Sequence, residues 1–208
     1  MVELTFLGYE LLSALIPFLV VLVIFRNTQK KKGVSYTQYS FIAMIVFAVY
    51  MVGVYHFTGA GTIYDGLMYQ FEWRHDQFNL IPFSNSIDVV AYVLNVVLFV
   101  PLGLLVPIIW EKMNQFSNLL VTGFLFTVFI EVSQLLNNRR TDIDDILLNV
   151  LGAVVGFGLF KIFDKVTKSK FCVKNPIVDE LMISVIAVFL GRFFLYDEMG
   201  LAKILYGF

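Results

Sequence analysis

Hydrophobic residues occur along this chain in long runs that polar segments interrupt, a pattern typical of membrane-spanning helices. A hydrocarbon core about 30 Å thick requires roughly 20 apolar residues in a helix, because lipid offers the backbone no other hydrogen-bond partner. Five runs meet this length, and a sixth is a further candidate. The predicted spans are Leu11–Phe25 (from Leu4 if tilted), Tyr39–Phe57, Val89–Trp110, Leu119–Leu136, Ile146–Phe163 and Ile177–Leu195. We therefore predict an all-α, polytopic transmembrane helix bundle of five to six spans.

Composition supports this prediction and limits the alternatives. Of the 208 residues, 59% are hydrophobic and 15% are charged, whereas a soluble domain carries about a quarter charged residues. The length suits a single membrane domain, 1–208. A net charge of -1 and the lack of a basic stripe with interleaved aromatics give no indication of a nucleic-acid partner. The single cysteine, Cys172, excludes an internal disulfide.

Lysine and arginine are distributed unevenly over the predicted connections. One side of the bundle collects ten of the fifteen: Arg26, Lys30, Lys31, Lys32, Lys112, Lys161, Lys165, Lys168, Lys170 and Lys174. Short loops rich in these residues stay in the cytoplasm. We therefore predict a multi-pass membrane protein whose basic side faces the cytoplasm and whose termini both lie outside. The connection 58–88 is then an extracellular or re-entrant loop, in which Pro82 pushes Ile81 toward an extended conformation.

Polar residues in three predicted spans fall at similar depths below the outer side. At 1.5 Å per residue, Asn95, Glu131 and Asn149 lie about 10, 8 and 6 Å below the outer ends of their helices. Gln134 follows Glu131 at i+3 on the same helix face. A charged group inside a span usually faces the bundle interior or a wet cavity. We therefore expect an outward-facing polar cavity. Arg74, His75, Arg139, Asp142, Asp144 and Asp145 are candidates to close over it.

Simpler structural roles are available for most of these residues. Thr141 and Asp144 resemble a capping box, and the aspartates around them suit a helix N-terminus. Asn95 and Asn149 are also candidates for interhelical hydrogen bonds, and Gly152 and Gly156 for a close helix-packing face. Arg139 could extend along the membrane surface. Glu131 is the residue that these roles explain least, because capping does not apply at its depth.

The chain resembles the VanZ-like family of bacterial membrane proteins, which is named for a teicoplanin-resistance accessory protein. Over a core at 74–156, the resemblance is carried in order by Asn79–Phe83 (NLIPF), Asn95–Gly103 (NVVLFVPLG), Glu131–Gln134 (EVSQ) and Arg139–Gly152 (RRTDIDDILLNVLG). It implies a helical membrane protein linked to glycopeptide susceptibility at the cell envelope. It supplies no reaction mechanism.

Two functions remain as alternatives, with a transporter ranked third because no inverted repeat is visible. The first is binding of membrane lipids, and of a lipid-linked cell-wall precursor or a glycopeptide antibiotic. Its ligand-binding candidates are Arg74, His75, Asn79, Asn95, Gln134, Arg139 and Asn149. The second is an intramembrane enzyme acting on an envelope lipid or peptidoglycan precursor. Its catalytic candidates are Glu131, Asp142 and Asp145, and Asp142, Asp144 and Asp145 are candidates to hold a divalent cation.

Overall fold

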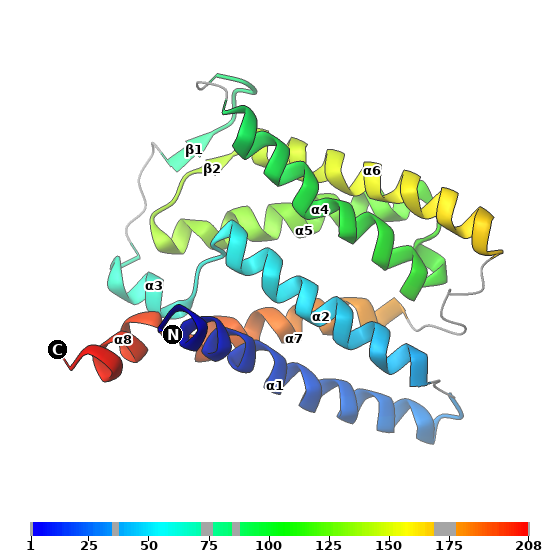
Figure 1. Ribbon diagram of the computed structural model, residues 1–208, viewed down its shortest axis with the longest axis horizontal. Coiled ribbons are helices and arrows are strands. Elements are labelled where there is room, and N and C mark those ends of the chain that lie inside the picture. The colour runs from blue at the N-terminus through cyan, green and yellow to red at the C-terminus, as the bar shows by residue number, and fades with distance from the viewer. Residues whose placement is uncertain (1, 35–37, 72–76, 85–87, 169–177, 208) are drawn as a thin grey trace.

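The structure, a computed structural model, describes residues 2–34, 38–71, 77–84, 88–168 and 178–207. Within these residues, six long helices lie side by side (Figure 1). They are α1 (Val2–Lys31), α2 (Gln38–Thr58), α4 (Val89–Ile109), α5 (Phe116–Gln134), α6 (Ile143–Thr167) and α7 (Val178–Leu195). The predicted all-α helix bundle is confirmed.

The shorter elements connect these helices, and most gather at one end of the bundle. They are the helices α3 (Ile63–Met68) and α8 (Glu198–Tyr206), the 3-10 turns η2 (Glu111–Met113) and η3 (Leu135–Asn137), and the strands β1 (Phe78–Asn79) and β2 (Thr141–Asp142). The two strands pair in parallel, with Phe78 opposite Thr141. Both strands, α3, α8 and the N-terminal end of α1 lie at the same end (Figure 1), which we call the polar end.

Five segments are long and apolar enough to cross a membrane. They are Glu3–Lys31, Tyr39–Met68, Val89–Ile109, Phe116–Asn137 and Ile143–Thr167. Large apolar side chains point outward from them, including Ile24, Val90 and Ile162, each more than half exposed. Such a surface is stable in lipid and unfavourable in water. The chain is therefore a multi-pass membrane protein.

Helix α7, at the predicted sixth span, lies antiparallel along α1. Two buried ion pairs join the helices: Arg26 Nε lies 2.7 Å from Glu180 Oε1, and Arg192 Nε lies 2.7 Å from Glu10 Oε1. Glu10 and Arg26 are about 24 Å apart along α1 at 1.5 Å per residue. Between the pairs, a Cβ at Gly191 would come 2.8 Å from the Ser13 carbonyl oxygen, so the backbones approach closely. Helix α7 therefore packs against α1 from Glu10 to Arg26, but it carries Asp179, Glu180 and Arg192 and is not among the five segments above.

Glycines set the distance between α4 and α6, which pack along much of their lengths. A Cβ at Gly152 would collide with the Val96 carbonyl oxygen, and one at Gly156 with that of Val100. Gly103 on α4 makes the reciprocal approach to the Ala153 carbonyl oxygen. Small residues that let backbones meet are typical of membrane helix interfaces. The predicted packing face at Gly152 and Gly156 is confirmed.

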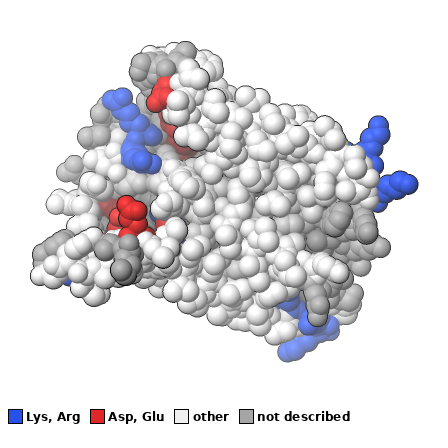
Figure 2. All heavy atoms as spheres, viewed as in Figure 1, with Lys and Arg blue, Asp and Glu red and all other residues white. Residues whose placement is uncertain are grey.

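Charge differs between the two ends of the bundle. Acidic side chains gather at the polar end beside basic ones, and basic side chains project from the opposite end (Figure 2). Lysines of α1 and α6 belong to that opposite, basic end. This segregation is what the sequence predicted for the loops. The assignment of the basic end to the cytoplasm, and of the termini to the outside, stays a prediction.

The predicted loop 58–88 contains a short helix and a strand. Thr62 begins α3 through a capping box, in which its hydroxyl accepts from the Asp65 N–H while Asp65 Oδ2 accepts from the Thr62 N–H at 2.7 Å. The described part of this connection lies at the polar end (Figure 1). Arg74 and His75 lie outside the described residues.

Candidate functional site

Polar residues from α4, α5 and α6 line one cavity of about 350 Å³ near the polar end. We call it the polar cavity. Its lining comprises Phe57, Thr58, Ala91, Asn95, Glu131, Gln134, Arg139, Arg140, Asp145 and Asn149. The sequence predicted that Asn95, Glu131 and Asn149 would meet, and the structure brings all three to this cavity, with Gln134 and Arg139.

Glu131 faces the protein interior. It is 2% exposed, and its Oε2 accepts a hydrogen bond from the Asp142 N–H at 3.2 Å. The Thr141 hydroxyl donates to the Glu131 carbonyl oxygen at 3.0 Å. These two bonds hold β2 against the end of α5, so the segment that precedes α6 is positioned directly by Glu131.

The two asparagines use their amide groups differently. Asn95 Nδ2 donates to Asp145 Oδ1, which joins α4 to α6 at the cavity wall. Asn149 Nδ2 donates to the Thr127 hydroxyl at 2.8 Å, which joins α6 to α5. Both therefore make the interhelical bonds expected of polar groups in a bundle. The Asn149 Oδ1 atom, however, is buried and has no partner among the described residues, so it can accept a hydrogen bond from a ligand.

Arg139 and Gln134 are held at the end of α2. Both donate to the Thr58 carbonyl oxygen, at 2.7 Å from Arg139 Nη1 and 2.7 Å from Gln134 Nε2. The last carbonyls of a helix lack partners within it, so these side chains cap α2. Asn138, in the left-handed conformation with φ 60°, ends η3 and turns the chain toward Arg139. Arg139 is exposed at the cavity mouth beside Arg140.

The three aspartates contact different partners. Asp142 is the N-cap of α6, accepting from the Asp144 N–H at 3.0 Å, and it also accepts from Asn79 Nδ2 at 3.1 Å. Asp144 accepts from the Phe83 N–H at 2.8 Å and from the Tyr92 hydroxyl at 2.6 Å. The Thr141 capping box suggested by the sequence is therefore wrong, because the cap is one residue later.

These contacts bear on the catalytic and metal candidates. Asp145 joins Glu131 in the polar cavity, whereas the Asp142 side chain caps α6 and is not among the lining residues. Among the residues that the structure describes, no three His, Cys, Asp or Glu side chains are grouped to hold a metal. The cation site at Asp142, Asp144 and Asp145 stays a prediction. Asn79 lies outside the cavity and ties its own segment 79–83, which we call the hinge segment, to Asp142.

Comparison with known families agrees with this geometry. A model of the VanZ/LLP1 family matches residues 14–164, most of the chain. The chain belongs to the VanZ/LLP1 family. No curated protein and no solved structure matches it. The matched region contains every lining residue of the polar cavity, so this cavity is built from the VanZ/LLP1 part of the chain.

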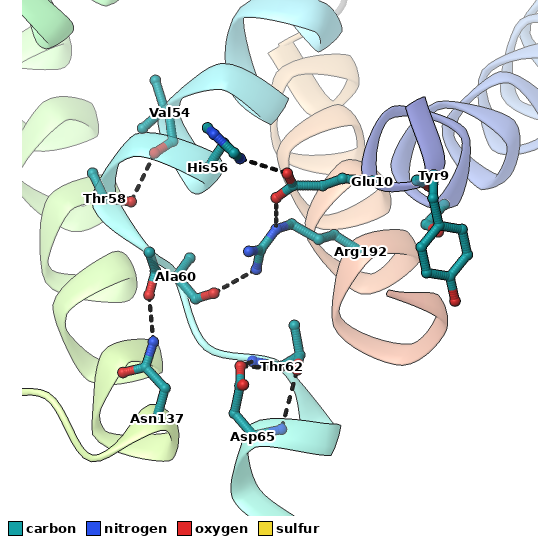
Figure 3. Close-up of polar contacts among 12 residues, drawn as sticks. Tyr9, Glu10, Val54, His56, Thr58, Ala60, Thr62, Asp65, Asn137 and Arg192 are labelled. Carbon is teal, nitrogen blue, oxygen red and sulfur yellow. Dashed lines mark hydrogen bonds and ion pairs between the residues drawn. The ribbon is translucent and has the colours of Figure 1, made fainter. Parts of the chain in front are cut away.

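A larger cavity of about 1100 Å³ at the polar end was missed from the sequence. We call it the terminal cavity, because α1, α7 and α8 line it together with α3. Its deepest polar group is Glu10, whose two oxygens contact Arg192 Nε at 2.7 Å and His56 Nδ1 at 2.6 Å (Figure 3). Glu10 and Arg192 lie outside the VanZ/LLP1 match. Their presence inside apolar helices was the signal that could have found this cavity.

Three successive carbonyls separate the two cavities. Beyond the Thr58 oxygen, Asn137 Nδ2 donates to the Gly59 oxygen at 2.6 Å, and Arg192 Nη1 donates to the Ala60 oxygen (Figure 3). Gly59 has φ +66°, a left-handed conformation common just after a helix. Arg139 borders both cavities. In this VanZ/LLP1 chain, the end of α2 therefore forms the wall that the cavities share.

Proposed function

We propose that this VanZ/LLP1 protein binds an anionic, lipid-linked component of the bacterial cell envelope in the polar cavity. One observation carries the proposal: Arg139 and Arg140 line the mouth of the cavity, and buried polar groups line the wall behind them. Arginine binds phosphate and carboxylate through two parallel hydrogen bonds. Arg139 uses Nη1 for the Thr58 carbonyl, and its other N–H groups have no partner among the described residues.

The wall favours a particular arrangement of the ligand. Glu131 and Asp145 place two carboxyl groups deep in the cavity, so a phosphate or carboxylate of the ligand belongs at the arginines. Carboxylates and the Asn149 Oδ1 atom accept hydrogen bonds from hydroxyl or amide groups. A phosphate followed by a sugar or a peptide has this order of groups. Lipid-linked cell-wall precursors are ligands of that kind.

The size of the cavity fits a headgroup and leaves the lipid chains outside. Ligand cavities usually measure about 300–1,000 Å³, and the polar cavity, at about 350 Å³, is near the lower limit. Phe57, 75% exposed, lies at its edge, and Val132 and Val90 are exposed on the neighbouring helices. These apolar surfaces are available to acyl or polyprenyl chains that remain in the bilayer.

Lipid retention during purification tests the proposal. We expect wild-type protein to retain an anionic lipid, and Arg139→Gln to reduce the retained amount by about tenfold, because a charged hydrogen bond contributes about 1.5–3 kcal/mol. Arg139→Lys keeps the charge and should retain an intermediate amount. Lys165→Gln, an exposed lysine at the basic end, is the matched control. Mass spectrometry of the bound lipids measures each; equal retention by Arg139→Gln and wild type, with the fold intact, contradicts the proposal.

The link to glycopeptide resistance belongs to the same proposal. If the cavity binds a cell-wall precursor or the drug, producing the protein in a susceptible bacterium should raise the inhibitory concentration of teicoplanin. Arg139→Gln should lose that increase and Lys165→Gln should keep it. If the Arg139→Gln variant still raises the inhibitory concentration, resistance does not depend on the polar cavity.

One observation favours catalysis as a second candidate. Glu131 and Asp145 share the cavity with an unpartnered amide oxygen, and two carboxylates can divide general acid and base roles. Glu131→Gln keeps the shape and the acceptor for the Asp142 N–H. Turnover of an envelope lipid that Glu131→Gln abolishes, with lipid retention preserved, would identify an enzyme. Retention without turnover would leave binding as the function.

A further inference from the structure

The floor of the terminal cavity contains a guanidinium group with N–H groups that have no hydrogen-bond partner among the described residues. Arg192 is buried, with Nε on Glu10 and Nη1 on the Ala60 carbonyl (Figure 3). Its Nη2 has no hydrogen-bond partner among the described residues, although Arg192 lines the cavity. Both Glu10 oxygens are engaged, by Arg192 and by His56. The floor therefore offers donors, and its single carboxylate is already paired.

The rim of the same cavity has the opposite character. Four further acidic residues line this cavity: Glu3, Asp65, Asp197 and Glu198. Glu3 and Glu198 are exposed, whereas Asp65 and Asp197 also cap α3 and α8. Of the basic lining residues, Lys203 and Arg139 remain near the opening. Figure 2 shows acidic side chains gathered at this end. A ligand that enters here meets negative charge first and guanidinium donors below.

We propose that the terminal cavity binds the headgroup of a zwitterionic phospholipid with a primary amine, its phosphate on Arg192 and its amine at the acidic rim. In such a lipid the phosphate is nearer the acyl chains and the amine is nearer the water. The protein has the matching order, because Arg192 lies within α7 while Glu198 begins α8 beyond the end of that helix. A purely anionic headgroup would satisfy the floor and be repelled by the rim.

The surroundings support a lipid. Phe6, Leu7 and Met199 line the cavity among its charged groups. On α8, Ile204, Leu205 and Tyr206 are exposed, while Lys203 faces the rim. Exposed apolar and aromatic side chains beside a charged one, at the end of a membrane-spanning bundle, are typical of the membrane interface. The cavity therefore lies where phospholipid headgroups are found.

Charge-neutralising changes on the rim test the proposal without disturbing the floor. Glu3, Glu198 and Lys203 are exposed, and none makes a hydrogen bond or ion pair through its side chain within the described part of the chain. The protein is purified in mixed micelles with equal amounts of phosphatidylethanolamine, phosphatidylglycerol and phosphatidylcholine, and the retained lipids are quantified. We expect wild type to prefer phosphatidylethanolamine. Glu3→Gln with Glu198→Gln should lower its ratio to phosphatidylglycerol by a factor of about two to five per charge.

Lys203→Gln is the matched control: it removes a positive charge from the rim, so it should raise the ratio of phosphatidylethanolamine to phosphatidylglycerol. Circular dichroism establishes that each variant is folded. A wild-type protein with no preference, a ratio unchanged by the double substitution, or equal retention of phosphatidylcholine, which has no N–H on its amine, would each overturn the proposal. None of these three residues lines the polar cavity, so failure here is distinguishable from failure of the Arg139 experiment.

Discussion

Substituting Arg192 with methionine should destabilise the bundle, because it leaves Glu10 buried without its strongest partner. Glu10 is 1% exposed and receives a charged hydrogen bond of 2.7 Å from Arg192. Removing one member of a buried pair costs about 3–5 kcal/mol. His56, 2.6 Å from the other Glu10 oxygen, remains as a partner, so we expect a cost of about 3 kcal/mol, near the lower limit.

Substituting both residues tests whether the loss of stability comes from the interaction between Glu10 and Arg192. Glu10→Gln with Arg192→Met has no uncompensated charge, so its cost should be smaller than the sum of the two single costs by about 0.5–3 kcal/mol, the range for residues in contact. Unfolding of the purified protein in mixed micelles with rising denaturing detergent measures each free energy, and Lys203→Met is the surface control. Purely additive costs in the four proteins would refute the idea that this pair joins α1 to α7.

The remaining predictions concern packing, the hinge segment and orientation. Gly156→Ala should cost about 1–3 kcal/mol through overpacking, whereas Gly158→Ala, with open space around its Cβ position, should be neutral or stabilising by up to about 1 kcal/mol; thermal unfolding compares them, and equal effects would contradict the packing role. Asp144→Ala removes acceptors for the Phe83 N–H and the Tyr92 hydroxyl and should speed hydrogen exchange at Phe83, while Tyr92→Phe should leave that amide protected. In a Cys172→Ser background, Lys203→Cys should react with an impermeant maleimide on intact cells and Lys165→Cys only after permeabilisation; the reverse result would invert the predicted orientation.

The sequence was sufficient for the helices and for the polar cavity because both depend on regular geometry. Helical rise places Asn95, Glu131 and Asn149 at similar depths, and the cost of burying a carboxylate in lipid turns Glu131 inward. The packing of Gly152 and Gly156 follows from spacing on one helix face. Each of these predictions uses only the spacing and polarity of residues along a single helix.

Contacts between distant segments were not predictable in the same way. The sequence placed the cap of α6 at Thr141, but Thr141 donates to the Glu131 carbonyl and Asp142 takes the capping position. The terminal cavity depends on the pairing of Glu10 with Arg192, which are at opposite ends of the chain. No periodicity within one helix indicates which distant helix supplies the partner of a buried charge.

The end of α2 explains why two arginines occupy such similar positions. A helix C-terminus carries partial negative charge and leaves its last carbonyls unpaired, so it attracts cations. Arg139 donates to the oxygen of Thr58, the last residue of α2, and Arg192 donates to the oxygen of Ala60, two residues beyond the helix. Each guanidinium has N–H groups without a partner among the described residues; Arg192 lines the terminal cavity, and Arg139 lines both cavities. Bonds to these carbonyls therefore hold both arginines in place before any ligand binds, which reduces the entropy that anion binding must overcome.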